Sequence, residues 1–436
     1  MHDQAGWVAS RGGALSGELA IPGDKSVSHR AVMFAALADG ESRIDGFLEG
    51  EDTRATAAIF AAMGVGIDAP SASRRIVRGV GIDGLRAPAG VLDCGNSGTG
   101  MRLLSGLLAG QRFDSVLAGD ASLSQRPMQR VMAPLRAMGA VIDSDDGERP
   151  PLRISGGQAL RGIDFASPVA SAQVKSAGLL AGLYADGETV VREPRPTRDY
   201  TERMLASFGW PVEFAPGMAR LRGGHRLRAG EVEVPGDFSS AAFFIVAATL
   251  VPGSLLLLRS VGVDPRRTGL LDALRAMGAD IRLLDPREGA CGPVADIEVR
   301  HAPLRGIDLP EALVADMIDE FPAFAVAAAC ASGTTRVTGA GELRVKESDR
   351  ISAMATGLQA LGARVRETPD GMVVEGGALR GGRVDGLGDH RIAMAFAVAA
   401  QLADGEVAID DVANVATSFP GFDELARGAG FGLRAA

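Results

Sequence analysis

The sequence lacks an excess of positive charge, and this absence limits what the chain binds. The 436 residues include 45 basic and 54 acidic ones, which gives a formal net charge of −9. General nucleic-acid binding needs a broad positive surface, so this balance argues against it. We therefore expect any site for anions to be local.

Cysteines are few and widely separated. The three, Cys94, Cys291 and Cys330, lack the spacing of metal ligands. This usage is typical of reduced thiols in a cytosolic protein. We expect no metal site.

Long apolar runs are also missing. The most apolar stretch, residues 241–258, is interrupted by Pro252 and Gly253 and does not read as one membrane-spanning helix. The first residues show no basic start followed by an apolar block, so we read no signal peptide. We expect a soluble, cytoplasmic protein that does not bind membranes.

Lysine is the rarest basic residue, with only Lys25, Lys175 and Lys346 among the 45 basic positions. An arginine bias of this kind is typical of a GC-rich genome. A lysine kept against the bias can mark a position that needs a compact, titratable ammonium. Chance survival explains it equally well.

What the sequence does contain is repetition. Six segments share an Ala-rich apolar helix, a glycine and a short β-like run; their glycines are Gly40, Gly110, Gly187, Gly253, Gly333 and Gly405. In a second, interleaved series, a glycine stands where a helix would end in a left-handed residue before a strand. These glycines are Gly64, Gly139, Gly209, Gly278, Gly362 and Gly430. Each unit therefore reads strand–helix–strand–helix–strand–strand.

The two halves of the chain resemble each other. IPGDKSVSHRAVMFAA from Ile21 matches VPGDFSSAAFFIVAA from Val234. We predict an α/β fold of two pseudo-symmetric domains, each of three repeated βαβαββ units. One domain is expected over 25–235, and the other over 236–436 together with the N-terminal segment 1–24, whose residues 7–20 complete its sheet. The alternative is two unrelated Ala-rich domains. It does not explain why the twelve glycines of the two series follow similar helical segments.

Polar and basic residues gather just before the first-series helices. Helix N-termini carry free N–H groups and partial positive charge, and so attract anions. If the repeats surround pseudo-three-fold axes, these helix starts point the same way, and two facing domains would enclose small, highly charged ligands. The residues are Lys25, Ser26, His29, Arg30, Asn96, Ser97, Gly98, Thr99, Arg102, Ser171, Gln173, Lys175, Asp237, Ser239, Ser240, Asp319, Glu320, Asp389, His390 and Arg391.

Each of these positions also has a simpler explanation. The hydroxyl and carboxyl side chains could be plain helix caps: Ser26, Thr99, Ser171, Asp237, Asp319 and Asp389. His29 and His390 are better explained as hydrogen-bonded structural residues than as metal ligands. The recurrence of such residues at equivalent positions of several repeats argues for a site.

The second-series helices begin with a further set of charged residues. Gln125, Arg126 and Pro127 open one helix, and Thr197, Arg198 and Asp199 open another. A third begins with the run Lys346–Glu347–Ser348–Asp349–Arg350, in which Lys346 and Arg350 share a helix face with Glu347. A solvated, salt-bridged helix start is the alternative interpretation of this run.

Eight motifs occur in order along the chain: PGDKSVSHR, GNSGTGMR, QRPM, SAQVKS, DMIDEFP, RVKESDR, GDHRIAM and TSFP. In these motifs, over essentially its whole length, the chain resembles the 5-enolpyruvylshikimate-3-phosphate synthase family. The resemblance implies the inside-out α/β fold of the enolpyruvyl transferases. It also implies transfer of the enolpyruvyl group of phosphoenolpyruvate to the 5-hydroxyl of shikimate 3-phosphate, in the shikimate pathway to chorismate and the aromatic amino acids.

The resemblance also implies site residues. Shikimate 3-phosphate would be held by Lys25, Ser26, Arg30, Ser171, Gln173, Arg198, Asp319 and Lys346. Phosphoenolpyruvate would contact Lys25, Gly98, Arg126, Gln173, Arg350 and Arg391. Asp319 is expected to be the base at the 5-hydroxyl, Glu347 the proton donor and acceptor at C3, and Lys25 a source of charge or a proton near the departing phosphate. No metal or organic cofactor is expected, the partners are the two small anionic substrates, and the protein is expected to be a monomer.

Two positions depart from the family pattern. Thr417 stands in TSFP where many relatives carry lysine, and Ala172 stands where many carry a second serine. UDP-N-acetylglucosamine enolpyruvyl transferase is the nearest rival, but that family typically has Lys-Asn at the first site and a cysteine-bearing loop. RNA 3′-phosphate cyclase and a non-catalytic anion-binding protein are more distant alternatives.

Overall fold

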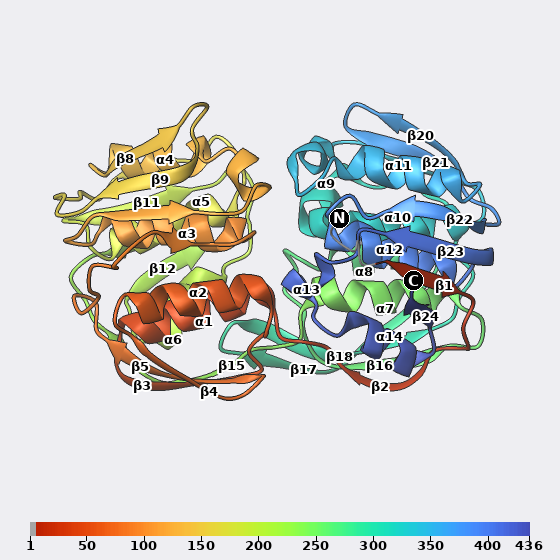
Figure 1. Ribbon diagram of the computed structural model, residues 1–436, viewed down its shortest axis with the longest axis horizontal. Helices are drawn as coiled ribbons and strands as arrows, with labels where there is room; N and C mark the ends of the chain where they lie inside the picture. The colour runs from red at the N-terminus through yellow and green to blue at the C-terminus, as the bar shows by residue number, and fades with distance from the viewer. Residues whose placement is uncertain (1–5) are drawn as a thin grey trace. The chain divides into compact units, whose positions relative to one another are not determined.

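The computed structural model describes residues 6–436, and this part of the chain divides into two compact units (Figure 1). The N-unit holds Gly23–Val234 together with Gly289–Gly292. The C-unit holds the described chain up to Pro22, Pro235–Glu288 and Pro293–Ala436. The sequence predicts domain boundaries between residues 24 and 25 and between residues 235 and 236, whereas no sequence pattern predicts the short return at Gly289–Gly292.

Each unit contains three small sheets within the described residues. In the N-unit the strands are β3 (Ala38–Asp45), β4 (Gly66–Ser71), β5 (Arg74–Val80), β6 (Leu92–Asp93), β7 (Ser115–Ala118), β8 (Val141–Asp145), β9 (Arg149–Ser155), β10 (Asp164–Ala166), β11 (Glu188–Arg192), β12 (Val212–Ala215), β13 (Met218–Arg222), β14 (Leu227–Arg228) and β15 (Glu231–Glu233). The sheet orders are β14-β3-β5-β4 with β15 also on β3, β6-β7-β9-β8 and β10-β11-β13-β12. The strands joined through an inner helix pair in parallel, as β10 and β11 do. The strands β14 and β15 also lie parallel to β3, and the other pairs, such as β11 with β13, are antiparallel.

The C-unit repeats this plan. Its strands are β1 (Trp7–Ser10), β2 (Ser16–Ala20), β16 (Leu255–Gly262), β17 (Asp280–Gly289), β18 (Gly292–Arg300), β19 (Thr334–Val337), β20 (Arg364–Thr368), β21 (Gly371–Glu375), β22 (Arg380–Asp385), β23 (Asp404–Asp410) and β24 (Gly432–Ala435). The orders are β17-β18-β16-β2, β19-β21-β20 and β22-β23-β1-β24. The first strands of the chain therefore complete two sheets of this unit: β2 lies parallel to β16, and β1 lies antiparallel to both β23 and β24.

In the described part of the chain, six helices lie in the interior, three in each unit. They are α1 (Lys25–Leu37), α3 (Gly98–Ala109) and α5 (Ala172–Gly182) in the N-unit, and α7 (Phe238–Leu250), α10 (Phe321–Cys330) and α12 (His390–Ala400) in the C-unit. Every residue of α7 is buried, as is nearly every residue of the others. Small side chains allow this close packing: a Cβ added to Gly106 in α3 would lie 2.1 Å from the carbonyl oxygen of Ala177 in α5.

The remaining helices alternate with the inner ones along the chain and expose more of their surface. They are α2 (Glu51–Ala62), α4 (Gln129–Ala137), α6 (Tyr200–Ser207), α8 (Gly269–Ala276), α9 (Glu311–Val314), α11 (Arg350–Ala360), α13 (Val415–Ser418) and α14 (Phe422–Ala429). The short 3-10 helices are η1 (Leu123–Gln125), η2 (Ala315–Glu320) and η3 (Gly341–Val345). All six second-series glycines have positive φ, between 81° at Gly209 and 114° at Gly430. The predicted left-handed helix ends are therefore confirmed.

Candidate functional site

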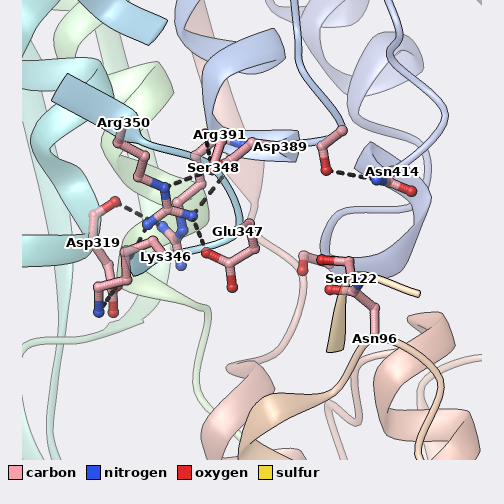
Figure 2. A network of polar contacts seen from close by, with 12 residues as sticks. Asn96, Ser122, Asp319, Lys346, Glu347, Ser348, Arg350, Asp389, Arg391 and Asn414 are labelled. Carbon is pink, nitrogen blue, oxygen red and sulfur yellow. Dashed lines mark hydrogen bonds and ion pairs between the residues drawn. The ribbon is translucent and has the colours of Figure 1, made fainter. Parts of the chain in front are cut away.

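Arg350, the first residue of α11, lies at the centre of a polar cluster in the C-unit (Figure 2). Its side chain is 1% exposed and donates hydrogen bonds to Glu347 Oε2 and to Asp389 Oδ2, both at 2.7 Å. Its Nη1 lies 3.7 Å from Asp319 Oδ1. Burial disfavours the charge of the guanidinium, but the surrounding carboxylates outweigh burial and raise the pKa of Arg350. One buried cation thus orients three carboxylates.

Asp319 and Glu347 are the two carboxyl groups of this cluster that remain in part accessible, at 22% and 23% exposure. Asp319 comes from η2, just before α10, and its Oδ1 also lies 3.5 Å from Lys346 Nζ. Glu347 lies in the segment between η3 and α11. The structure thus brings together two partly accessible carboxyl groups, Asp319 and Glu347, with the cation Arg350 in contact with both. This arrangement is suited to proton transfer beside a bound anion.

Asp389 joins the starts of two helices. It is the N-cap of α12, where its Oδ1 accepts from the backbone N–H of Arg391, and it also holds Arg350 at the start of α11. Its side chain is fully buried, yet Arg350 outweighs burial and lowers the pKa of Asp389. The side chain of Arg391 in turn donates to the backbone oxygen of Asp319 at 3.1 Å.

A further layer of polar residues lies behind Asp319. Glu320 is 2% exposed; it accepts a hydrogen bond from Ser239 and lies 3.9 Å from Arg391 Nη1. Arg267 donates to Asp237 Oδ1 at 2.7 Å and to Ser239 Oγ at 2.9 Å. The sequence motifs do not single out Arg267, and its one signal is a position just before α8, since α4, α6 and α11 also follow basic residues.

In the N-unit, Lys25 is the first residue of α1 and forms an ion pair with Asp52 in the first turn of α2. Asp52 is 3% exposed whereas Lys25 is 23% exposed. The pair therefore fixes an ammonium that remains accessible at a helix start.

Arg30 lies one turn further along α1, within a group of hydroxyls. Its Nε donates to Thr201 Oγ1 at 2.8 Å, its Nη2 to Ser176 Oγ at 2.9 Å and its Nη1 to the backbone oxygen of Ser26 at 2.9 Å. Burial, with the nearby charge of Arg198, lowers the pKa of Arg30 to about 10. The two guanidiniums repel each other, and an anion bound beside them would reduce this repulsion.

The starts of α3 and α5 meet through side chains. Arg102 Nη1 donates to Gln173 Oε1 at 2.9 Å, and Gln173 Nε2 donates to Thr99 Oγ1 at 2.9 Å. Arg126 Nη2 donates to Asn96 Oδ1 at 2.7 Å. A Cβ added to Gly98 would lie 2.9 Å from Arg102 Nη1 and 3.1 Å from Arg126 Nη1. A side chain at position 98 would therefore crowd both guanidiniums.

The simpler explanation as helix caps is correct for three of its six residues. Ser171, Asp237 and Asp389 are the N-caps of α5, α7 and α12. The explanation is wrong for Ser26, Thr99 and Asp319, because the chain begins those helices at neighbouring positions. Asp24, Ser97 and Glu320 occupy the N-cap positions of α1, α3 and α10.

His29 is confirmed as a hydrogen-bonded structural residue. It is fully buried, with Nδ1 2.7 Å from Thr56 Oγ1 and Nε2 3.2 Å from Ser97 Oγ. Burial, with Lys25 and Arg30 nearby, lowers the pKa of His29 well below 6.5. A neutral imidazole thus links α1 to α2 and to the N-cap of α3. Within residues 6–436, no group of three or more His, Cys, Asp or Glu side chains is placed to hold a metal ion.

At the departure from the family pattern, Thr417 is buried in α13 and donates from Oγ1 to the backbone oxygen of Asn414 at 2.7 Å. Asn414 Nδ2 donates in turn to the backbone oxygen of Gly388, next to Asp389 (Figure 2). This segment is therefore linked to the start of α12 by hydrogen bonds rather than by a cationic side chain at position 417.

Two α/β units of three small sheets each, with cations and carboxylates gathered at helix starts, define an enolpyruvyl transferase-like protein. The sequence profile of the EPSP synthase (3-phosphoshikimate 1-carboxyvinyltransferase) family matches residues 9–425. The chain belongs to this family.

Individual relatives agree with that assignment. The chain is 70% identical over 430 residues to the 3-phosphoshikimate 1-carboxyvinyltransferase of Xanthomonas oryzae pv. oryzae strain PXO99A, covering 99% of this chain and 98% of that one. It is equally similar, with the same coverage, to the enzyme of the same description from Xanthomonas axonopodis pv. citri strain 306. A solved EPSP synthase from Acinetobacter baumannii has a TM-score of 0.90 at 48% identity, covering 99% of this chain and all of that one.

The predicted fold class and enzyme class are thereby confirmed. The protein is a transferase that carries out enolpyruvyl transfer in the shikimate pathway, towards the aromatic amino acids. Among residues 6–436, the helices are all too short or too polar to cross a membrane.

Proposed function

We propose that the two polar clusters bind phosphoenolpyruvate and shikimate 3-phosphate, with the residue roles that the motifs predict. Shikimate 3-phosphate is assigned to Lys25, Ser26, Arg30, Ser171, Gln173 and Arg198 of the N-unit and to Asp319 and Lys346 of the C-unit. Phosphoenolpyruvate is assigned to Lys25, Gly98, Arg126 and Gln173 of the N-unit and to Arg350 and Arg391 of the C-unit. Support comes from the concentration of guanidinium, ammonium and hydroxyl groups at helix starts in a chain whose net charge is −9.

The proposed reaction is an addition followed by an elimination. Asp319 takes the proton of the 5-hydroxyl as its oxygen attacks C2 of phosphoenolpyruvate, and C3 gains a proton from Glu347. The tetrahedral intermediate then loses phosphate from C2 and returns a C3 proton to Glu347, which restores the double bond. Lys25 and the arginines stabilise the carboxylate and the departing phosphate, and the phosphate is a sufficient leaving group without a metal or cofactor.

The observation that carries this proposal is the shared guanidinium of Arg350. It contacts both carboxyl groups to which the mechanism assigns proton transfer, Asp319 at 3.7 Å and Glu347 at 2.7 Å. A protein that only bound anions would gain nothing from two partly accessible carboxylates beside its cations. An acid–base pair needs such fixed positions, because proton transfer requires short, oriented contacts.

The test is the variant Asp319→Ala, assayed by phosphate release from both substrates. Loss of the base should lower kcat by about 10² to 10⁴-fold, while calorimetry should still detect binding of each substrate. Asp308→Ala is the matched control, because Asp308 is an exposed carboxylate of the same unit in an ion pair with Arg336. Unchanged turnover in the Asp319 variant would remove this residue from the mechanism.

The acceptor is tested separately. UDP-N-acetylglucosamine in place of shikimate 3-phosphate should give no phosphate release with the unmodified enzyme. Turnover with the nucleotide sugar instead would favour the rival enolpyruvyl transferase family.

We also infer a cytoplasmic monomer that binds no nucleic acid. Its three cysteines are free, and burial raises the pKa of Cys330 to about 12, so that this thiol stays protonated and unreactive, in keeping with a reducing compartment. Light scattering during gel filtration tests the oligomeric state, for which a mass near 44.9 kDa is expected.

A further inference from the structure

Lys175 of α5 forms a buried triad with two carboxylates in the N-unit. Its Nζ lies 2.8 Å from Glu202 Oε1 and 3.0 Å from Glu193 Oε2, and the three side chains are 4%, 2% and 0% exposed. Burial opposes the charge of the ammonium, but Glu202 and Glu193 outweigh it and raise the pKa of Lys175. Buried ion pairs are a poor source of stability compared with apolar packing. This triad therefore calls for a role in fixing a conformation.

The two carboxylates lie at the two ends of one segment. Glu193 directly follows β11, and Glu202 lies in the first turn of α6, so that residues 193–202 are held at both ends by a single ammonium. Glu193 also accepts a hydrogen bond from Thr197 Oγ1 at 2.6 Å, which folds the middle of the segment back on its start. Arg198, a residue assigned to shikimate 3-phosphate, directly follows Thr197.

The neighbour of Lys175 on α5 holds the same segment. Ser176 Oγ lies 2.7 Å from Thr201 Oγ1, and both hydroxyls accept hydrogen bonds from Arg30. Arg198 is close enough to Arg30 for its charge, after burial, to lower the pKa of Arg30. Lys175 and Ser176, consecutive residues of α5, thus both contact the segment 193–202, which carries Arg198.

We propose that Lys175 is a positioning residue for shikimate 3-phosphate, which acts through Glu193 and Glu202 to hold Arg198 beside Arg30. Two adjacent guanidiniums repel each other, so their juxtaposition must be maintained by the fold until a dianionic phosphate binds between them. The triad supplies that constraint and touches no substrate itself. This inference rests on the proposed assignment of Arg30 and Arg198 to shikimate 3-phosphate.

Glu193→Gln is the informative variant, because it leaves Lys175 and Glu202 as a one-to-one ion pair and creates no uncompensated buried charge. We expect the Kd for shikimate 3-phosphate, measured by calorimetry without phosphoenolpyruvate, to rise about 3- to 10-fold, as for contacts in one coupled network. The value of kcat and the KM for phosphoenolpyruvate should stay within about twofold. Glu213→Gln is the control, since it breaks an exposed ion pair with Arg220 between β12 and β13 of the same sheet, and its Kd should match that of the unmodified enzyme.

A double-mutant cycle with Arg198→Ala separates positioning from folding. If the triad acts through Arg198, adding Glu193→Gln to Arg198→Ala should weaken binding no further. An undiminished loss in the Arg198→Ala background would overturn the proposal, as would an unchanged Kd in a folded Glu193→Gln protein. The triple variant Lys175→Met, Glu193→Gln, Glu202→Gln removes all three charges together, and it should show the same loss of affinity. Unmodified enzyme that neither binds shikimate 3-phosphate nor releases phosphate would instead overturn the proposed function.

Discussion

At the residue scale, the buried carboxyl group of Glu320 should make the stability of the protein depend on pH. Burial, together with the neighbouring Asp319, raises the pKa of Glu320 above 4.5. Between the pKa of the unfolded chain and the raised pKa, the folded chain binds a proton at Glu320 that the unfolded chain has released. The contribution of Glu320 to stability is therefore present at low pH and is lost as pH rises through the raised pKa.

Glu320→Gln removes this titration and retains a carbonyl oxygen that can accept the hydrogen bond from Ser239. Relative to the unmodified protein, the variant should gain stability between pH 5 and pH 8, by about 1.4 kcal/mol for each unit of the shift. Urea unfolding at both pH values measures the difference. Glu375→Gln, at an exposed carboxylate of β21, serves as control and should show the same difference at both pH values. A Glu320→Gln difference that did not change with pH would contradict the raised pKa.

The residues of the C-unit cluster divide into those that the sequence predicts and those that it does not. Lys346, Glu347 and Arg350 share one short motif, so the sequence predicts that they lie close together. The predicted shared helix face is wrong, because α11 begins only at Arg350, and Lys346 and Glu347 lie in the non-helical segment after η3. The contact of Arg350 with Asp389, 39 residues away, depends on how α11 packs against α12. Arg267 is the extreme case, because its partner Asp237 lies 30 residues away in another helix cap and no local pattern joins the two.

At the element scale, Gly106 controls how closely α3 approaches α5. These two helices also carry Arg102 and Gln173, whose hydrogen bond joins their starts. Gly106→Ala would place a methyl group 2.1 Å from a backbone oxygen, so the helices must separate. We expect a loss of about 1–3 kcal/mol in the free energy of unfolding, with a higher KM for phosphoenolpyruvate.

The matched control is Gly178→Ala in α5, where the new methyl would meet only Val191 Cγ2 at 3.4 Å. With space available inside a helix, this change should stabilise the protein by about 0.4–1 kcal/mol. Thermal unfolding and steady-state kinetics of both variants check the pair. Equal stability of the two proteins would show that the close approach at Gly106 does not limit the packing.

The ends of helices could be predicted from the sequence where a local residue type requires one backbone conformation. The second-series glycines mark helix ends because only glycine readily takes the left-handed conformation before the next strand. The exact first residues of α1, α3 and α10 could not be predicted. Serine, threonine and acidic residues stand at adjacent positions there, and tertiary packing selects the N-cap among them. The place of β1 between β23 and β24 depends on a pairing across about 400 residues, which no local pattern encodes.

At the scale of the whole molecule, the division of the assigned residues between the units leads to the last prediction. Of those assigned to shikimate 3-phosphate, Arg30 and Arg198 belong to the N-unit, and Asp319 and Lys346 to the C-unit. Within residues 6–436, the backbone connects these units through the crossings after Pro22 and after Val234 and the short return at Gly289–Gly292. If one ligand binds to residues of both, it must restrict whatever relative movement those connections allow.

Small-angle scattering with saturating shikimate 3-phosphate should therefore give a smaller radius of gyration than scattering from the free protein. Inorganic phosphate at the same concentration should not, because it lacks the ring hydroxyls that Asp319 and Lys346 are proposed to bind. Lys346→Met should weaken the response to shikimate 3-phosphate by removing an anchor of the C-unit, while binding through the N-unit persists. Identical scattering with and without the saturating ligand, in protein that calorimetry shows to be occupied, would mean that one unit binds this substrate alone, and the C-unit assignments of Asp319 and Lys346 to it would fall.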